Sequence, residues 1–274
     1  KAFLEKILKD IKPNQKVLDK FKNQVILDKE KNYNEFIKRW LREDKVRITR
    51  GKSLLKTHSE LLEKIEKEFN VDKEVIVALW GTETYYGEIT GDYDIISSLA
   101  TLSFEGRRRK FYETQLNATL RLLKQNKVKR EHLIGSWAGA TGQCQFMPSN
   151  ISAYGIDYDR DGEINLWSSL PDIFASMAKL LKSAGWKYRK SIGDLAIAPP
   201  HFKGDLNKYR TPKQYNNLGF KHLNGQPFKD ESWSARRASE IPMKNSPIVL
   251  RGSNYTPILK WNRSSLFAAF NILL

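Results

Sequence analysis

A lone carboxylate, Glu83, stands in an apolar stretch that covers residues 75–87. Counting back three and seven residues reaches Trp80 and Ile76, so a helix would place Glu83 on the face expected to be buried. Burial and the negative end of the helix dipole both disfavour the charged form, and we therefore expect a raised pKa at Glu83. A carboxylic acid that stays protonated near neutral pH can donate a proton. A structural salt bridge to an arginine explains the residue equally well from this stretch alone.

A second segment, residues 135–149, combines glycines with Ser136, Gln143 and Gln145. Glycine lets the backbone approach a ligand closely, and neutral hydroxyl and amide groups suit the hydroxyls and amides of a sugar. The alternative is a glycine-rich turn between helices in which Phe146 packs in the core. For this apolar side chain we favour the core.

Residues 157–168 have the pattern of an EF-hand calcium loop. Carboxylates occupy the first, third and fifth positions, a glycine follows, and the seventh residue can bind calcium through its carbonyl. Ser168 stands at the twelfth position, where a glutamate normally supplies two oxygens, so we expect weak calcium binding. An Asx-turn loop of the same shape without calcium is the alternative. The candidate metal ligands are Asp157, Asp159, Asp161, Glu163 and Ser168.

Four consecutive cations, residues 107–110, open a predicted helix that continues through Phe111 and Leu123. Such a run is either solvated or holds an anionic substrate. Sequence alone favours the solvated alternative.

The elements that must position these groups are mostly helices. Residues 1–70 place apolar side chains at three- and four-residue spacing among lysines and glutamates, which indicates several amphipathic helices. Further helices are expected from about 170 to 184 and from 264 to 273. Residues 187–257 are rich in proline, glycine and asparagine with short apolar bursts, which predicts short strands and loops.

The composition describes a folded, basic protein. With 40% hydrophobic residues and a net charge of +16, the chain should form a core and attract polyanions such as nucleic acid, anionic lipid or an acidic cell-wall polymer. It contains no nucleic-acid-reading motif, so we expect no nucleic-acid partner.

The single cysteine, Cys144, excludes an internal disulfide. Its neighbours in sequence include no acid–base partner, so we do not expect Cys144 to act as a nucleophile. No apolar run approaches the roughly 20 residues that span a bilayer and no secretory segment follows Lys1, so a membrane anchor would lie outside this chain.

Five motifs in order resemble the lytic murein transglycosylase B family, enzymes that cleave bacterial peptidoglycan. The resemblance runs from about residue 54 to 186, with a weaker echo at Trp261 and Asn262. It implies a mainly α (α+β) fold, in which a lysozyme-like helical core carries an N-terminal helical lobe and a small β-containing lobe. The motifs are residues 81–87, 99–104 followed by Arg107 and Arg108, 135–140, 145–149 and 157–167.

We accordingly divide the chain into four regions. Residues 1–70 form the N-terminal lobe, 71–186 the catalytic core, 187–257 the β lobe, and 258–274 a helix that returns to the core.

The resemblance also implies roles for individual residues. Glu83 is the expected catalytic acid, and catalysis is expected to need no cofactor. A structural Ca²⁺ is expected in the 157–168 loop. Phe267 stands where the family often has a tyrosine. Substrate contacts are implied for Arg107, Arg108, Tyr112, Ser136, Gln145, Phe146, Asn262 and Phe267.

The resemblance therefore predicts a lytic transglycosylase that cleaves the MurNAc-β-1,4-GlcNAc bond and forms 1,6-anhydromuramoyl products, with Glu83 acting as acid and then as base. The expected partners are peptidoglycan glycan strands and other cell-wall enzymes. The expected state is a monomer in the periplasm of a Gram-negative bacterium, either free or as an outer-membrane lipoprotein. A hydrolytic muramidase and a non-catalytic peptidoglycan-binding protein are the alternatives.

Overall fold

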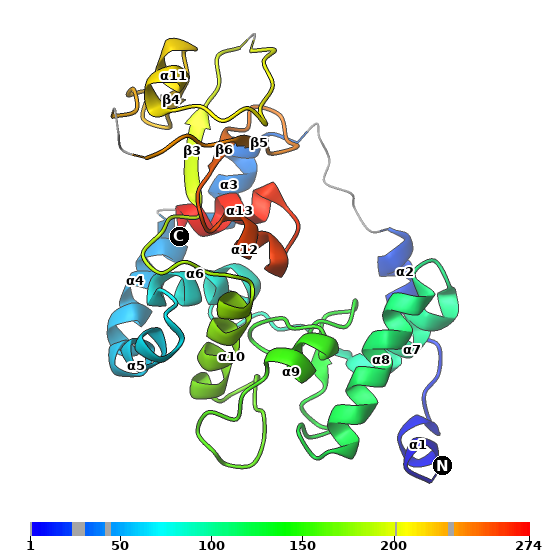
Figure 1. Cartoon of the computed structure of the whole chain (residues 1–274). Coiled ribbons are helices and arrows are strands. Elements are labelled where there is room, and N and C mark those ends of the chain that lie inside the picture. The colour runs from blue at the N-terminus through cyan, green and yellow to red at the C-terminus, as the bar shows by residue number, and fades with distance from the viewer. Residues whose placement is uncertain (1, 24–30, 42–44, 201, 230–232) are drawn as a thin grey trace. The chain divides into compact units, whose positions relative to one another are not determined.

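The computed structural model describes residues 2–23, 31–41, 45–200, 202–229 and 233–274, and about half of them are helical (Figure 1). The helices are α1 (Ala2–Leu8), α2 (Gln15–Lys22), α3 (Tyr33–Leu41), α4 (Val46–Thr57), α5 (Ser59–Phe69), α6 (Lys73–Thr84), α7 (Ile95–Glu105), α8 (Arg109–Lys124), α9 (Pro148–Tyr154), α10 (Leu170–Ser183), α11 (Pro212–Asn217), α12 (Tyr255–Trp261) and α13 (Ser265–Leu273). The strands are β1 (Tyr93–Asp94), β2 (Ile134–Gly135), β3 (Gly193–Ile197), β4 (Lys221–His222), β5 (Ala238–Glu240) and β6 (Ile248–Arg251).

The chain divides into two units. Unit 1 comprises Lys1–Val25, His58–Phe69 and Leu79–Leu180, and unit 2 comprises the remaining segments. The boundary falls inside α6, so this helix contributes to both units. The four regions predicted from the sequence are not tested by this division and stay predictions.

Unit 1 is built around the pair of helices α7 and α8, which pack against each other. Asp94 begins α7 because its side chain accepts a hydrogen bond from the Ser97 backbone at 2.8 Å. Gly106 ends the helix with φ of +102°, a left-handed conformation that favours glycine. The short strands β1 and β2 pair antiparallel, with Tyr93 opposite Gly135. This pairing fixes the start of the glycine-rich segment that follows β2.

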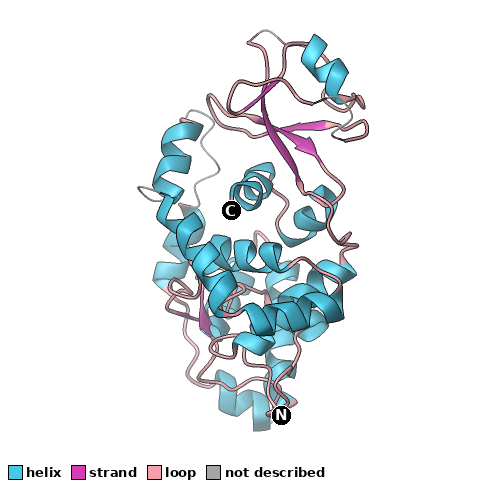
Figure 2. Cartoon of the chain, turned by 90° about the vertical axis from the view of Figure 1, so that its left-hand side faces the viewer, coloured by secondary structure: helices cyan, strands magenta, loops and turns pink. Residues whose placement is uncertain are grey.

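Unit 2 contains a four-stranded antiparallel sheet in the order β4-β3-β6-β5. Its strands lie together in Figure 2, and Figure 1 shows α11 beside β4. Val249 on the central strand β6 pairs with Leu195 on β3 and with Ser239 on β5. Tyr215 of α11 and Leu250 belong to the same buried cluster, so α11 is held to the sheet by apolar packing.

Aromatic stacking joins two segments of unit 2 that are distant in the sequence. The Trp40 ring of α3 lies 4.1 Å from the Phe270 ring of α13, with 10° between the planes. This contact ties the last helix of the chain to a helix near its start.

The predicted secondary structure is largely confirmed. The helices expected at 170–184 and 264–273 are α10 and α13, and the expected short strands within 187–257 are β3 to β6. The fold is mainly helical with a small β-containing part, as the sequence predicts.

Candidate active site

Glu83 lies in the last turn of α6 and is partly buried, as predicted. Gly87 is a residue type that ends many helices, and the sequence therefore favours a helix that runs to this glycine, but α6 ends earlier, at Thr84. Tyr85 and Tyr86 already adopt left-handed φ angles of 53° and 62°, and such angles in bulky residues are uncommon.

The early end of α6 has a packing cause. A Cβ atom at Gly81 would lie 2.6 Å from the Tyr86 ring, so only glycine leaves room for this ring against the helix. The Tyr86 backbone N–H also donates to the Trp80 carbonyl at 3.2 Å, which closes the helix end. The turn after Glu83 is therefore set by buried aromatic side chains.

Gln143 holds this end of α6 to the glycine-rich segment. Its side-chain oxygen accepts a hydrogen bond from the Trp80 indole N–H at 2.8 Å, and its backbone carbonyl accepts one from the Thr84 hydroxyl at 2.8 Å. A Cβ atom at Gly87 would lie 2.3 Å from the same side-chain oxygen. The residues on either side of Glu83 in the helix are thus anchored to one glutamine.

The same glutamine also binds the segment that ends the EF-hand-like loop. The Gln143 amide nitrogen donates to the Trp167 carbonyl at 2.8 Å, and its backbone N–H donates to the Leu166 carbonyl at 2.7 Å. The sequence suggests a sugar-binding role for the Gln143 amide, but both ends of this amide bond protein groups. Sequence reasoning missed this positioning role because the partners lie far apart along the chain.

The end of α6 that carries Glu83 packs against aromatic side chains. Trp80 is 4% exposed and packs edge to face against Phe174 at 5.1 Å. Cys144 is fully buried; this burial raises the pKa of its thiol, and the nearby charge of Glu83 adds to the rise. A protonated, buried thiol is a poor nucleophile. Glu83 is therefore the group near this helix end that is suited to proton transfer.

Ser136 and Gln145 lie in the same unit as Glu83. The Ser136 hydroxyl accepts a hydrogen bond from the Ala140 backbone at 3.0 Å, which closes a tight turn. Gln145 has φ of 48°, and its amide nitrogen donates to the carbonyls of Thr90 at 3.0 Å and Gly142 at 3.1 Å. Among the described residues its amide oxygen accepts no hydrogen bond, so this oxygen remains suited to a ligand N–H or hydroxyl.

The cationic run is partly neutralised by neighbours. Arg107 forms a salt bridge with Glu105 at 3.0 Å and lies 4.0 Å from the Phe21 ring. Arg108 is exposed and lies 4.4 Å from the Phe111 ring. Tyr112 is 2% exposed, and this burial raises the pKa of its hydroxyl against the opposing effect of Arg108. Arg108 is thus the predicted cation best placed to meet an anion.

The three remaining residues predicted to contact substrate are either buried or belong to unit 2. Phe146 is 1% exposed, which agrees with the core position favoured from the sequence. Asn262 is exposed after α12, and Phe267 is 6% exposed within α13. Both belong to unit 2, whereas Glu83 belongs to unit 1, so their substrate contacts stay predictions.

The EF-hand-like loop folds around its own carboxylates. Asp157 accepts hydrogen bonds from the backbone of Asp161 at 3.1 Å and of Gly162 at 2.9 Å, and Asp161 accepts one from Glu163 at 2.9 Å. The Glu163 carboxylate pairs with Lys129 at 2.8 Å, which is consistent with metal binding through its backbone carbonyl. Hard cations such as calcium prefer this set of oxygen donors.

The twelfth position of the loop supplies only a weak calcium ligand, Ser168, as the sequence predicts. Its hydroxyl accepts a hydrogen bond from the Asn165 amide at 2.8 Å and carries no charge. A buried carboxylate, Asp172, stands nearby, with an oxygen within 4.8 Å of oxygens of Asp157 and Asp159. Asp172 already accepts backbone hydrogen bonds from Tyr158 at 2.7 Å and Asn165 at 2.8 Å. Burial raises the pKa of Asp172, and these bonds oppose the rise.

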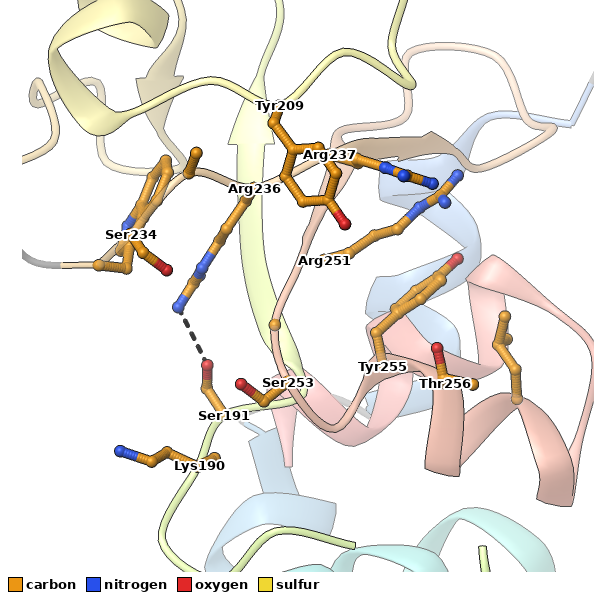
Figure 3. Close-up of a pocket in the computed structure, with 14 residues that line it drawn as sticks. Lys190, Ser191, Tyr209, Ser234, Arg236, Arg237, Arg251, Ser253, Tyr255 and Thr256 are labelled. Carbon is orange, nitrogen blue, oxygen red and sulfur yellow. Dashed lines mark hydrogen bonds between the residues drawn. The ribbon is translucent and has the colours of Figure 1, made fainter. Parts of the chain in front are cut away.

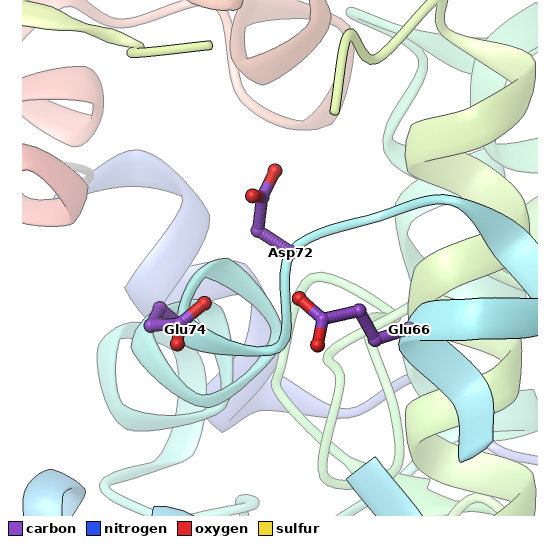
Figure 4. Close-up of side chains that lie close together, drawn as sticks. All are labelled: Glu66, Asp72 and Glu74. Carbon is purple, nitrogen blue, oxygen red and sulfur yellow. The ribbon is translucent and has the colours of Figure 1, made fainter. Parts of the chain in front are cut away.

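A second acidic group is not a site. Figure 4 shows Glu66 on α5 and Asp72 and Glu74 at the start of α6, and these residues belong to different units. Asp72 accepts hydrogen bonds from the Trp186 indole at 2.7 Å and from the Arg189 backbone at 3.0 Å. Its carboxylate therefore has a structural role within unit 2.

A comparison with known protein families finds one family that matches the whole chain. A family model described as a transglycosylase SLT domain matches residues 1–274. The chain belongs to this transglycosylase family. It is 35% identical over 153 residues to membrane-bound lytic murein transglycosylase B of Escherichia coli (strain K12), and the match covers 54% of this chain and 42% of that relative. The matched part is thus less than half of that protein's length.

Solved structures of family members share the fold. SltB3 of Pseudomonas aeruginosa in complex with NAG-NAM-pentapeptide superposes with a TM-score of 0.85 at 32% identity, over 99% of this chain and 73% of that one. The same protein with NAG-anhNAM-pentapeptide gives 0.85 at 31% identity, over 99% and 72%. The E. coli lytic transglycosylase Slt35 in complex with calcium gives 0.80 at 25% identity, over 98% and 84%. The lysozyme-like fold expected from the sequence is confirmed.

One further observation concerns membranes. Within the part of the chain that the structure describes, each helix is too short or too polar to cross a bilayer.

Proposed function

We propose that this protein is a lytic transglycosylase that cleaves the MurNAc-β-1,4-GlcNAc bond of peptidoglycan, with Glu83 as its acid and base. The observation that carries the proposal is the position of Glu83. It is partly buried in the last turn of α6, beside Trp80 and Cys144, in a chain of the transglycosylase family. Such surroundings suit a carboxyl group that must hold a proton and then release it.

The reaction needs one carboxyl group in two protonation states. Protonated Glu83 donates its proton to the glycosidic oxygen, and the C1–O bond breaks to leave an oxocarbenium-like centre that the substrate's N-acetyl group stabilises. Ionised Glu83 then takes the proton of the muramoyl C6 hydroxyl, whose oxygen bonds to C1. The product is a 1,6-anhydro ring, and Glu83 is protonated again.

Two features support the use of a single acid. Hydrolysis of glycosides usually needs a second carboxylate to activate water or attack the sugar. Trp80, one turn before Glu83 on α6, instead packs against the aromatic rings of Tyr86 and Phe174. A complex of the related SltB3 contains NAG-anhNAM-pentapeptide, which is a ligand of the proposed product type. An apolar site limits the water available for hydrolysis.

The polar groups of unit 1 have proposed substrate roles. The free amide oxygen of Gln145 and the hydroxyl of Ser136 would meet sugar hydroxyls and amides, and Arg108 would meet the lactyl or peptide carboxylates of the wall. Tyr112 and Phe146 would border the sugar site from the core. We also propose substrate contacts for Asn262 and Phe267 of unit 2.

Calcium has a structural role in this proposal. Asp157, Asp159 and Asp161 would hold the ion with the Glu163 carbonyl and the Ser168 hydroxyl, weakly because the twelfth position carries no carboxylate. A calcium complex of the related Slt35 supports this site. Catalysis by Glu83 needs no cofactor.

We also propose that the protein acts as a monomer in the periplasm, free or anchored in the outer membrane through a segment outside this chain, together with other cell-wall enzymes.

Digestion of purified sacculi tests the proposal. The proposed enzyme releases soluble fragments with anhydro ends, whose mass is one water lower than that of fragments released by a muramidase. Fragments with reducing ends would favour the muramidase and contradict the proposal. Binding to sacculi without release of fragments would favour a non-catalytic wall-binding protein.

A further inference from the structure

Unit 2 contains a cationic pocket of about 580 Å³ beside its sheet (Figure 3). None of the described residues that line it is acidic. We call it the arginine pocket. Its principal side chains are Lys190, Tyr209, Arg236, Arg237, Arg251 and Tyr255.

The charges in the arginine pocket are held close together by the backbone. The Arg251 N–H donates to the Arg237 carbonyl at 2.8 Å, so these residues continue the pairing of β6 with β5. Like charges on neighbouring strands are destabilising by themselves. An anion bound between these two arginines would offset this repulsion.

The arginine side chains are oriented by neutral groups. Arg251 donates to the Ser239 hydroxyl at 2.6 Å and to the Asn207 amide oxygen at 3.3 Å, and neither of these partners carries a charge. The Arg237 guanidinium lies 4.4 Å from the Tyr209 ring and is exposed. Stacking on an aromatic face holds the planar group while its N–H donors remain available.

The third arginine, Arg236, is held in place by an acidic partner. Arg236 forms an ion pair with Asp194 and donates to the Ser191 hydroxyl at 3.1 Å, the bond drawn in Figure 3. Its guanidinium lies 4.7 Å from the Trp233 ring. Arg236 therefore shapes the pocket, whereas Arg237 and Arg251 offer the charge.

We infer that the arginine pocket binds the carboxylate groups of a murein stem peptide, and this inference rests on the proposed function. Arginine forks match carboxylates in pairs of parallel hydrogen bonds. A pocket of this size accepts a ligand of several residues rather than a small ion, and the hydroxyls of Ser191, Ser253 and Thr256 suit the amides of a peptide. The pocket would retain the peptide part of the wall polymer.

A titration with a synthetic stem tetrapeptide that carries no sugar tests this inference. Isothermal calorimetry on the full chain should detect binding, and Arg237→Gln should weaken it about tenfold because one charge-assisted pair is lost. Arg237→Lys should bind with intermediate affinity because it keeps the charge and loses the fork. The control is Arg121→Gln, an exposed arginine of α8 in unit 1, which should bind as the unmodified protein does.

Several outcomes would overturn the inference. They are no binding of the tetrapeptide at millimolar concentration, equal affinity of Arg237→Gln and the unmodified chain, or displacement of the peptide by an equal concentration of inorganic phosphate. Cleavage of peptide-free glycan strands, measured separately, reports on the proposed function. Arg237-dependent peptide binding without cleavage would support the peptide-binding role of the arginine pocket and contradict the proposed function. Cleavage without peptide binding would support the proposed function and contradict the role of the pocket.

Discussion

Two regions of unit 1 meet at Gln143 and Trp167, yet they are held by opposite kinds of groups. Around Glu83, neutral partners bind each other: the Gln143 amide joins the Trp80 indole and the Trp167 carbonyl, both at 2.8 Å. In the 157–168 loop, carboxylates such as Asp157 accept bonds from backbone N–H groups. The neutral network has no charge to compensate, whereas the loop gathers several negative charges in a small space.

The difference indicates how each region should respond to calcium and to pH. Hydrogen bonds between neutral buried groups depend little on ions or on pH. Clustered carboxylates repel each other and gain from a bound cation. We therefore expect the position of Glu83 to be insensitive to calcium concentration, and the loop to be stabilised by it.

Replacement of Glu83, the proposed catalytic group, should separate chemistry from structure most strongly. Glu83→Gln removes the proton that is transferred, so we expect a loss of about 10²–10⁴-fold in the rate of murein release. The free energy of unfolding should change by less than about 1 kcal/mol. The control, Glu88→Gln, alters an exposed residue after the helix and should keep its rate. A Glu83→Gln variant with nearly full activity would contradict the assignment.

Removal of the glutamine amide should break the neutral network. Gln143→Ala leaves the Trp80 indole N–H without its partner, and we expect a loss of about 2 kcal/mol in the free energy of unfolding. A shift of the helix end should also lower the release rate about 10- to 100-fold. Denaturant unfolding and a murein release assay measure both effects.

The matched control for this change is Gln125→Ala. Gln125 follows α8 and is exposed, so its stability should stay within about 0.5 kcal/mol of the unmodified protein. Equal stability of the two variants would mean that the Gln143 bonds do not hold α6.

Calcium should act on the charged loop with a smaller effect. At a calcium concentration about ten times the Kd, binding should add about 1.4 kcal/mol to the free energy of unfolding. Asp157→Ala should abolish this gain, and Asp10→Ala, which changes an exposed acid that follows α1, should retain it. Thermal melts with calcium and with a chelator measure the gain; no difference for the unmodified protein would exclude an occupied site.

The smallest expected effect concerns the buried thiol of Cys144. Burial raises the pKa of Cys144 above its usual 9.0, so the folded chain keeps this proton at a pH where the unfolded chain releases it. Stability should therefore fall as pH rises above 9.0, by at most about 1.4 kcal/mol per pH unit from this group.

Comparison with Cys144→Ala isolates the contribution of this thiol. The alanine variant should lack the part of the pH slope that the thiol causes. A thiol reagent should also label the folded protein far more slowly than the unfolded one. Rapid labelling of the folded protein would show that the thiol is accessible and not buried as described.

The sequence predicts elements well where the signal is local. The helix at 170–184 follows from apolar spacing and Gly185, and α10 confirms it. The end of α6 could not be predicted, because it depends on the Tyr86 ring packing where a Cβ atom of Gly81 would stand. Gly87 is a correct turn signal, with φ of 87°, but it acts after the helix has ended.

The candidate site shows the same limit. Glu83 is recognisable because an acid on an apolar helix face is unusual. The role of Gln143 depends on Trp80 and Trp167, which are distant in sequence, and the arginine pocket brings together residues on separate strands. No spacing rule relates such residues, so packing alone reveals them.

The mass of the product formed in heavy-oxygen water tests the central claim most directly. If Glu83 serves as both acid and base without an attacking water, fragments released from sacculi carry an anhydro end and no heavy oxygen. Fragments with a reducing end that contains heavy oxygen would show attack by water, and would contradict a single-carboxylate mechanism at Glu83.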